Sequence, residues 1–312
     1  PTLPKLTDEA FSKGLDEKLF QLEDHWILLK LKKTAKQIDH YFTNYQFDMA
    51  AQTAYEFFWN EFCAYYVEAI KPVLSGKQRD QKTRENKQKI LLIVLLQALR
   101  LLHPMAPFIT EELFQILKQR FPHVSLQKTQ DLLTQDAVAA LQSESCMTSP
   151  FPKPIDFDIQ TECEDGFEFI KKLIYSIRNV RGEMKIPPQT ATELYIAPNS
   201  NKFLQEHQDL LLSLVKISKI TFMPTIPEGI AGSTCVVDGI QLVIVMPQER
   251  LEQENARLLK EKDKLIISIE RTKAQMANRQ FLEKAPAQLI EKLKSGLAQA
   301  EKDLALIENK LK

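Results

Sequence analysis

The chain has 312 residues, of which 44% are hydrophobic and 26% are charged. This composition is ordinary for a folded protein and excludes an intrinsically disordered one, and the length predicts two or three domains. The formal net charge is zero, which excludes a uniformly basic protein but leaves room for local patches. Basic residues are concentrated in residues 71–90, with seven Lys or Arg against two acids, and in residues 271–294, with six against two.

The sequence carries no sign of export or of membrane insertion. Its four cysteines lie far apart without a C-x-x-C pair, which is typical of reduced thiols in a cytoplasmic protein. The longest apolar run, Ile90–Leu102, is too short to span a membrane. Nothing at the start resembles a signal peptide, and because the first residue is Pro1 we expect a piece of a longer cytoplasmic protein.

Residues 1–121 predict an antiparallel helical bundle. Apolar side chains recur at helical spacing, as in Leu22, Trp26 and Leu29, and an aromatic stripe marks a second helix. Prolines divide the helices, because the residue before a proline avoids helical geometry. The expected helices cover residues 21–45, from the cap Asp48 to just before Pro72, residues 90–102, and from Pro107 onward with Thr110 as candidate cap. Residues 77–89 are expected to form a charged loop.

Residues 122–160 lose this periodicity and include three prolines from Pro150 to Pro154, so we expect a linker or an extended segment. Helical spacing returns in residues 167–183 and is followed by three β-patterned pieces. In the last piece, Asp238-Gly239 between two apolar runs indicates a hairpin. Residues 161–247 therefore predict a small α+β domain.

Residues 248–312 have the pattern of a coiled coil. Two helical arms of about 25 residues, each about 40 Å long at 1.5 Å per residue, flank an interruption at residues 278–286. Pro286 suits the first turn of the second arm. We expect a C-terminal antiparallel coiled-coil hairpin. Its seam is weak, because Asn255 and Lys262 occupy positions where a strong dimer requires Leu or Ile.

No catalytic or metal-binding pattern occurs in the sequence. The five histidines have no metal-ligand spacing, and neither a glycine-rich phosphate loop nor a G-x-S-x-G motif is present. We therefore expect no catalysis and no cofactor in this piece of chain.

Basic stripes are the strongest candidates for binding, because cationic side chains neutralise RNA phosphates. The alternative is that each is a solvent-exposed face balanced by neighbouring acids. The two strongest candidates are a basic stripe beside the apolar face of residues 167–183 and a concentration of basic residues near the turn of the hairpin. The candidate RNA-binding residues are Lys30, Lys33, Lys36, Arg178, Arg181, Lys185, Arg271, Lys273, Arg279 and Lys284.

Several stretches resemble a known family. "DHWILLKL" at 24–31, "YQFDMAAQTAYEFFWNEFCAYYVEAIKPVL" at 45–74 and "LRLLHPMAPFITEELF" at 99–114 resemble the anticodon-binding bundle of class I aminoacyl-tRNA synthetases for aliphatic amino acids. The terminal stretch is similar to the C-terminal coiled coil of the valyl-tRNA synthetases, with their "N-x-x-F-x-x-K-A-P" connector from Asn278 to Pro286. Two departures are Lys30 in place of the family's arginine, and "FCAYYVE" in place of "F-C-D-W-Y-L-E".

The resemblance implies a partner and a parent enzyme. It implies that the bundle binds the anticodon stem and loop of valine tRNA, and that the hairpin rests against the outer corner of the same tRNA. It further implies a monomeric parent that attaches valine to tRNA with ATP, through catalytic and editing domains that would precede Pro1. Two alternatives stay open. One is a structural or interaction protein whose coiled coil docks on a partner, and the other is the equivalent region of an isoleucyl-tRNA synthetase.

Overall fold

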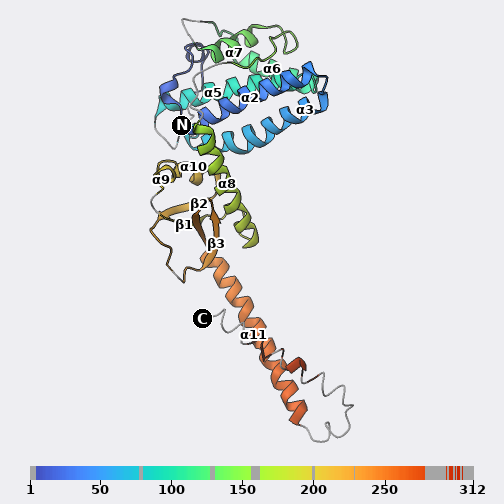
Figure 1. Cartoon of the computed structure of the whole chain (residues 1–312), viewed down its shortest axis with the longest axis vertical. Coiled ribbons are helices and arrows are strands. Elements are labelled where there is room, and N and C mark those ends of the chain that lie inside the picture. The colour runs from blue at the N-terminus through green and yellow to red at the C-terminus, as the bar shows by residue number, and fades with distance from the viewer. Residues whose placement is uncertain are drawn as a thin grey trace.

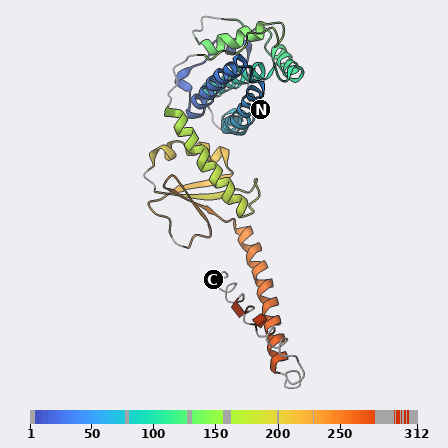
Figure 2. The ribbon, with the colours of Figure 1, turned by 45° about the vertical axis from the view of Figure 1, so that its right-hand side comes forward.

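The computed structural model describes residues 5–76, 80–126, 131–155, 162–198, 201–227 and 229–277, together with residues 293, 295–297, 299, 301, 302 and 304. Three parts follow one another along its length (Figure 1). A helical bundle lies at one end, a small sheet follows it, and a long helix leads away from the sheet. Turning the molecule shows the same order, with one helix running from the bundle onto the sheet (Figure 2).

The bundle buries one continuous apolar core in which Trp26, Phe57 and Ile93 are covered almost completely. Its elements are α1 (Asp8–Ser12), the 3-10 helix η1 (Glu17–Leu19), α2 (Leu22–Thr43), α3 (Phe47–Glu56), the π-helix η2 (Phe57–Val67), α4 (Glu68–Leu74), α5 (Gln81–Leu102), α6 (Pro107–Arg120) and α7 (Leu132–Gln142).

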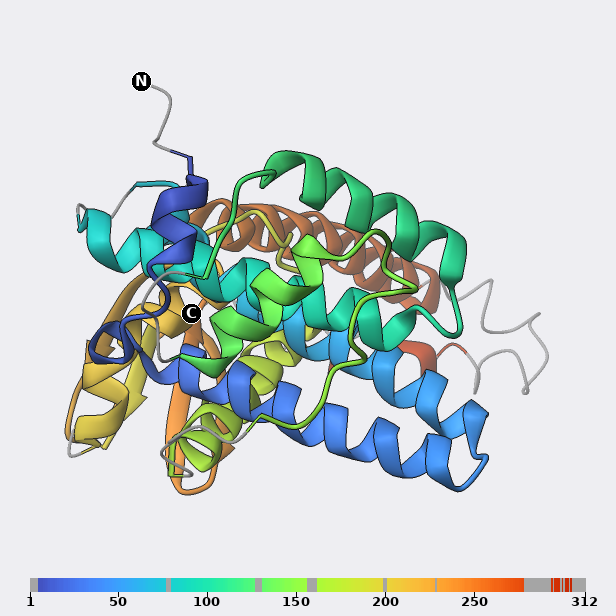
Figure 3. The same ribbon diagram turned by 90° about the horizontal axis from the view of Figure 1, so that it is seen from above.

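Buried polar contacts set the directions of these helices. Lys87, in the second turn of α5, contacts Glu23 and Asp24 in the first turn of α2, so both helices begin at the same end. The π-helix returns to that end, because the Tyr66 hydroxyl donates to Asp24 Oδ1 at 3.0 Å. The α2–α3 and α5–α6 turns therefore both lie at the opposite end of the bundle (Figure 3). We call this the distal end and define it by residues 42–48 and 103–108.

Helix α8 (Glu162–Glu183) joins the bundle to the sheet, since it packs on α2 and also on β3 and β4. The sheet has the order β2-β1-β4-β3, with β1 parallel to β2 and all other pairs antiparallel. Two short helices lie between β1 and β2. The bounds are β1 Thr192–Ala197, α9 Lys202–Glu206, α10 Gln208–Leu214, β2 Ile217–Phe222, β3 Gly232–Val237 and β4 Ile240–Val245.

The predicted hairpin at Asp238-Gly239 is confirmed. The two residues join β3 to β4 with φ angles of 46° and 82°, as a tight turn between twisted antiparallel strands requires. Helix α11 (Gln248–Ala277) then leaves the sheet. Farther along the chain, Glu301 forms an ion pair with Lys273 of α11 at 2.7 Å.

The structure confirms a mainly helical protein with a small mixed sheet. The C-terminal coiled-coil hairpin is not established by it, because the connector at residues 278–286 lies outside the described residues. The domain division at residues 121, 160 and 247 stays a prediction. None of the described helices is both long and apolar enough to cross a membrane. None of the four cysteines, all of which lie among the described residues, forms a disulfide, and burial raises the pKa of the Cys146 thiol to about 11.

Several local predictions are wrong. Pro72 does not end its helix but lies inside α4, where it removes one backbone donor. The cap of α3 is Gln46, which leaves Asp48 in the first turn. Thr110 does not cap α6. It is buried in the first turn, as the fourth residue of the helix, where its hydroxyl lies 2.7 Å from His103 Nδ1 and donates to the Ala106 carbonyl.

Two longer segments also differ from expectation. The charged loop predicted at residues 77–89 is, from Gln81 onward, the start of α5, because the Asp80 carboxylate caps the backbone amides of Lys82 and Thr83. Residues 122–160 are not irregular throughout, since α7 forms within them. Its cap, Asp131, also accepts a hydrogen bond from the backbone amide of Leu15 at 2.9 Å.

Candidate nucleic-acid interface

Lys30 and Lys33 lie at the junction between α2 and α8 and face acidic side chains there. Lys30 Nζ is 2.9 Å from Glu168 and 3.3 Å from Glu164. Lys33 pairs with Glu164 and remains more than half exposed. The two lysines therefore hold the first turns of α8 against the bundle. Lys36, one turn farther along α2, is exposed.

An aromatic stack lies beside these ion pairs. Trp26 stacks on Phe167 with ring centroids 4.1 Å apart, and its indole Nε1 donates to Glu168 at 3.2 Å. The Lys171 ammonium lies 5.3 Å from the centroid of Trp26 and 4.9 Å from that of Tyr65. In such cation–π contacts the ammonium group is attracted electrostatically to the face of the aromatic ring. The junction is thus specified by side chains from α2, η2 and α8.

Electrostatics at this junction favour the ionised carboxylates. Burial alone raises the pKa of Glu168, but hydrogen bonds from Lys30 and Trp26 and the charge of Lys171 outweigh burial, so this pKa lies below its ordinary value. The pKa of Glu164 is lowered in the same way by Lys33 and Lys30. Lys30 in turn has a raised pKa, because Glu168 outweighs the effect of burial.

A pH dependence follows from these shifts. A carboxyl group whose folded-state pKa is depressed stabilises the fold above its unfolded pKa, and this stabilisation is lost as the pH falls through the folded pKa. We therefore expect Glu168→Gln to lower the free energy of unfolding at pH 7, and the difference from wild type to shrink as the pH falls below the ordinary glutamate value of 4.5. Urea unfolding across this range measures it. A difference that stays constant with pH would contradict the assignment.

The stripe of Arg178, Arg181 and Lys185 is divided by the structure. Arg181 is buried and donates to Thr192 Oγ1 and to the carbonyls of Lys216 and Thr190 at 2.8–2.9 Å. Its guanidinium group is bound by the fold and does not extend into solvent. The interpretation of Arg181 as part of an exposed basic stripe, which rested on sequence spacing, therefore differs from the structure. Arg178 is exposed, although one of its guanidinium nitrogens donates to the Leu214 carbonyl at 2.9 Å. Lys185 is exposed at the end of α8 with φ 52°.

The candidates on the arm are described only in part. Arg271 is exposed on α11, and Lys273 is paired with Glu301. Arg279 and Lys284 lie outside the described residues. The structure thus brings Lys30 and Lys33 together, and it places the arm candidates on a different part of the molecule (Figure 1).

The distal end of the bundle presents aromatic side chains that sequence reasoning missed. Tyr45, Phe47 and Phe108 are 82%, 55% and 91% exposed. Tyr45 and Phe47 have ring centroids 6.2 Å apart, and Phe47 also lies 5.9 Å from Phe42. Exposed aromatic rings are costly in water and suit the stacking of unpaired bases. The available signal was an aromatic residue in each of two turns, "NYQF" and "MAPF".

Local geometry explains why these rings face outward. Tyr45 follows the C-cap Asn44 and adopts a φ of 58°, so the chain reverses direction there. Phe108 directly follows Pro107, which opens α6, and lies in its first turn. Among the described residues there is no cluster of His, Cys, Asp or Glu that could hold a metal ion. The exposed rings make stacking available at this end.

Family comparisons agree with this arrangement. Residues 24–196 match a family described as the anticodon-binding domain of tRNA ligase, and this match covers the bundle from α2 onward, α8 and most of the first strand. The chain belongs to this family. Residues 250–312 match a second family, described as the valyl tRNA synthetase tRNA binding arm. Among tRNA ligases, the chain thus corresponds to the anticodon-binding and arm region of the valyl-tRNA synthetases.

Individual relatives lead to the same assignment. The chain is 45% identical to a valine–tRNA ligase of Protochlamydia amoebophila over 310 residues, which are 98% of this chain and 33% of that protein. It is 34% identical to one of Chlamydia caviae, over 99% of this chain and 33% of the relative. The chain therefore spans about a third of the length of the curated relatives it matches. The isoleucyl alternative finds no support among these relatives.

Proposed function

We propose that this chain is the tRNA-binding C-terminal region of a valine–tRNA ligase, and that its distal end binds the anticodon loop of valine tRNA. The exposed rings of Tyr45, Phe47 and Phe108 carry this proposal. RNA is recognised in sequence mostly through unpaired bases, which stack on aromatic side chains and expose their edges to hydrogen bonds. Base contacts supply the choice of anticodon, whereas phosphate contacts supply salt-sensitive affinity.

The arm supplies the second contact in this proposal. Its two helices form an antiparallel hairpin whose tip carries Arg279 and Lys284, and this tip rests against the outer corner of the tRNA. The ion pair between Lys273 and Glu301 supports the hairpin, because it joins α11 to a residue that follows the connector. The bundle and the arm lie at opposite ends of the molecule (Figure 1), which suits contacts with two separate parts of one extended RNA.

The rest of the proposed enzyme lies outside this chain. The relatives are about three times as long as the matched region, and we infer that catalytic and editing domains belong to the remainder. That remainder would use ATP to activate valine and attach it to the tRNA. In this proposal the enzyme is a cytoplasmic monomer, and the region described here binds tRNA without cofactor and without charging it.

The proposal is tested by titrating the chain with valine tRNA and with the same tRNA altered only in its anticodon, at two salt concentrations. We expect tighter binding of the unaltered tRNA, and we expect this preference to persist at the higher salt. Equal, salt-sensitive binding of both would restrict the chain to an electrostatic contact. Absence of binding would favour the alternative of a structural protein with a coiled coil, which predicts self-association and indifference to RNA.

Aromatic substitutions at the distal end provide a sharper prediction. We expect Phe47→Ala and Phe108→Ala each to weaken binding by about 1–3 kcal/mol if one base stacks on each ring. The salt dependence should be unchanged, because no phosphate contact is removed. Tyr175→Ala is the matched control, since Tyr175 on α8 is 64% exposed but lies away from the distal end. An equal loss in the control would point to a general effect of surface aromatic residues.

A further inference from the structure

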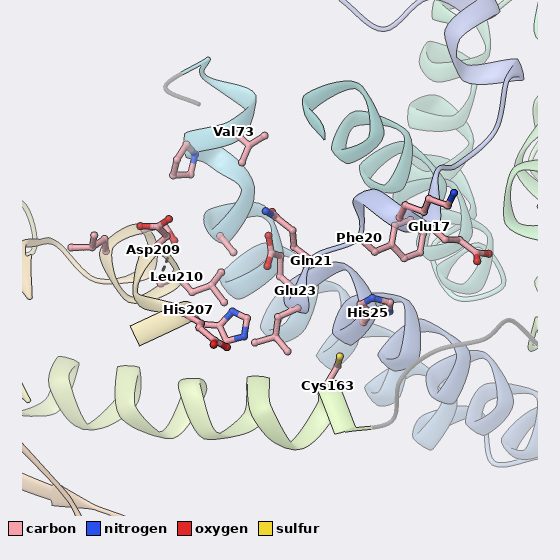
Figure 4. A pocket seen from close by; sticks show the side chains of 17 residues that line it. Glu17, Phe20, Gln21, Glu23, His25, Val73, Cys163, His207, Asp209 and Leu210 are labelled. Atoms are coloured by element: carbon pink, nitrogen blue, oxygen red, sulfur yellow. Dashed lines mark hydrogen bonds between the residues drawn. The ribbon is translucent and has the colours of Figure 1, made fainter. Parts of the chain in front are cut away.

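A groove of about 1030 Å³ lies at the end of the bundle opposite the distal end, where the bundle meets α9 and α10. Its walls come from η1 and the start of α2, from α4, from the start of α8 and from the two short helices of the sheet unit (Figure 4). Its apolar lining residues are Phe20, Pro72 and Leu212, which are partly exposed, and Leu22, Ala69, Val73 and Leu210, which are buried beneath them.

Carboxylates surround this apolar surface. Four acidic residues line the groove, Glu17, Glu23, Glu206 and Asp209, and Lys18 is the one lysine among the lining residues. Glu23 is already paired with the buried Lys87. The remaining three acids are exposed. Glu17 and Asp209 stand at opposite ends of the groove (Figure 4), so the negative charge is spread along its length.

We propose that this groove binds a polypeptide segment in which apolar side chains stand next to lysine or arginine. The apolar surface would bury the apolar side chains, and carboxylates at both ends would pair with the basic ones. Because carboxylates stand at both ends of the groove (Figure 4), a segment with more than one basic side chain complements it better than a single small amine. A nucleic acid is disfavoured, because its phosphates would face the exposed carboxylates. The groove is thus a protein-docking site separate from the proposed RNA contacts.

A charge-reversed variant isolates the contribution of the rim. Glu206→Lys with Asp209→Lys changes two exposed residues of α9 and α10 and leaves the apolar surface intact. The control is Glu183→Lys with Glu193→Lys, which changes the net charge equally at two exposed positions outside the groove. Circular dichroism should be the same for both variants and for the unmodified chain, and any gain in affinity for valine tRNA from the added positive charge should be equal in the two variants.

The test is a selection of random displayed peptides of about twelve residues on the immobilised chain. We expect enrichment of sequences that combine Leu, Ile or Phe with Lys or Arg. An enriched peptide, made synthetically, should bind the rim variant at least about tenfold more weakly, which corresponds to 1.4 kcal/mol. The control variant should bind it as the unmodified chain does.

The native cysteines locate the bound peptide. Cys163 lines the groove, whereas Cys235 lies on β3, and both thiols are partly exposed. Saturating peptide should slow alkylation of Cys163 and leave that of Cys235 unchanged. Enrichment of acidic peptides, equal affinity for the rim variant, no peptide above background, or unchanged alkylation of Cys163 would each overturn the proposal.

Discussion

Replacing Lys87 by methionine should lower the free energy of unfolding by about 3–5 kcal/mol, because it leaves two buried carboxylates without their cation. The side chains of Lys87, Glu23 and Asp24 are 1%, 7% and 0% exposed. The ammonium lies 2.5 Å from Glu23 Oε1 and 2.6 Å from Asp24 Oδ2. Asp24 also accepts hydrogen bonds from the Tyr66 hydroxyl and from the backbone N–H of Gln21.

The cluster contains two carboxylates and one ammonium group, so the destabilisation by Lys87→Met should depend on pH. Burial raises the pKa of the Asp24 carboxyl to about 6 although Lys87 opposes it. Burial also lowers the pKa of Lys87, but the two carboxylates outweigh burial and raise it. One ammonium therefore serves two carboxylates. A raised carboxyl pKa gives a stability contribution that is lost as the pH rises through that pKa.

Without Lys87 the Asp24 carboxyl group should titrate at still higher pH, because the charge that opposes the effect of burial is gone. We therefore expect the destabilisation by Lys87→Met to be larger at pH 7 than at pH 5, as measured by urea unfolding followed through Trp26 and Trp59. Adding Glu23→Gln and Asp24→Asn to Lys87→Met removes the unpaired charges and should restore most of the loss. A loss that is independent of pH, or no recovery in the triple variant, would mean that lost packing and not buried charge is responsible.

Replacing Arg181 by methionine should destabilise the sheet unit by about 3 kcal/mol, because hydrogen bonds to a charged donor contribute about 1.5–3 kcal/mol each and do not add fully. The guanidinium joins the end of α8 to the segment before β1 and to the residue before β2. Its acceptors are the Pro187, Thr190 and Lys216 carbonyls and the Thr192 hydroxyl.

Amide hydrogen exchange in β1 and β4 is the suitable measurement, since the tryptophans report on the bundle. We expect faster exchange in Arg181→Met and a smaller change in Arg178→Met, because Arg178 is exposed on the same helix and donates one hydrogen bond, to the Leu214 carbonyl, where Arg181 donates four. Affinity for valine tRNA, corrected for the folded fraction, should be unchanged in Arg181→Met. A reduced affinity with unaltered exchange would return Arg181 to the RNA-binding surface.

Periodicity and turn chemistry were sufficient for the elements with strong local signals. The stripe of Leu22, Trp26 and Leu29 predicts α2, and Asp238-Gly239 predicts the β3–β4 turn. The start of α5 was missed, because its sequence is charged enough to read as a solvated loop. The carboxylates that bury Lys87 lie more than 60 residues away in the chain, and no local pattern contains them.

The sequence predicts that the candidate site binds RNA, but it does not predict which residues form that site. Spacing placed Arg178 and Arg181 on one stripe, yet Arg178 is exposed and donates to the Leu214 carbonyl alone, whereas Arg181 is buried among the carbonyls of Thr190 and Lys216. Charge guided the search toward lysine and arginine, so the rings of Tyr45 and Phe108 were overlooked. Their exposure depends on where two turns fall in the bundle, which sequence periodicity does not specify.

Helix α8 has a mechanical consequence. It is one continuous helix of 22 residues, anchored to the bundle by the ion pairs of Lys30 and to the sheet by the Arg181 contacts. Bundle and sheet should therefore turn as one body when RNA occupies the distal end. Helix α11 has 30 residues, so it is about 45 Å long, and a tilt of about 10° at its base would move its far end by about 8 Å. A small rotation at one contact would thus become a large displacement at the other.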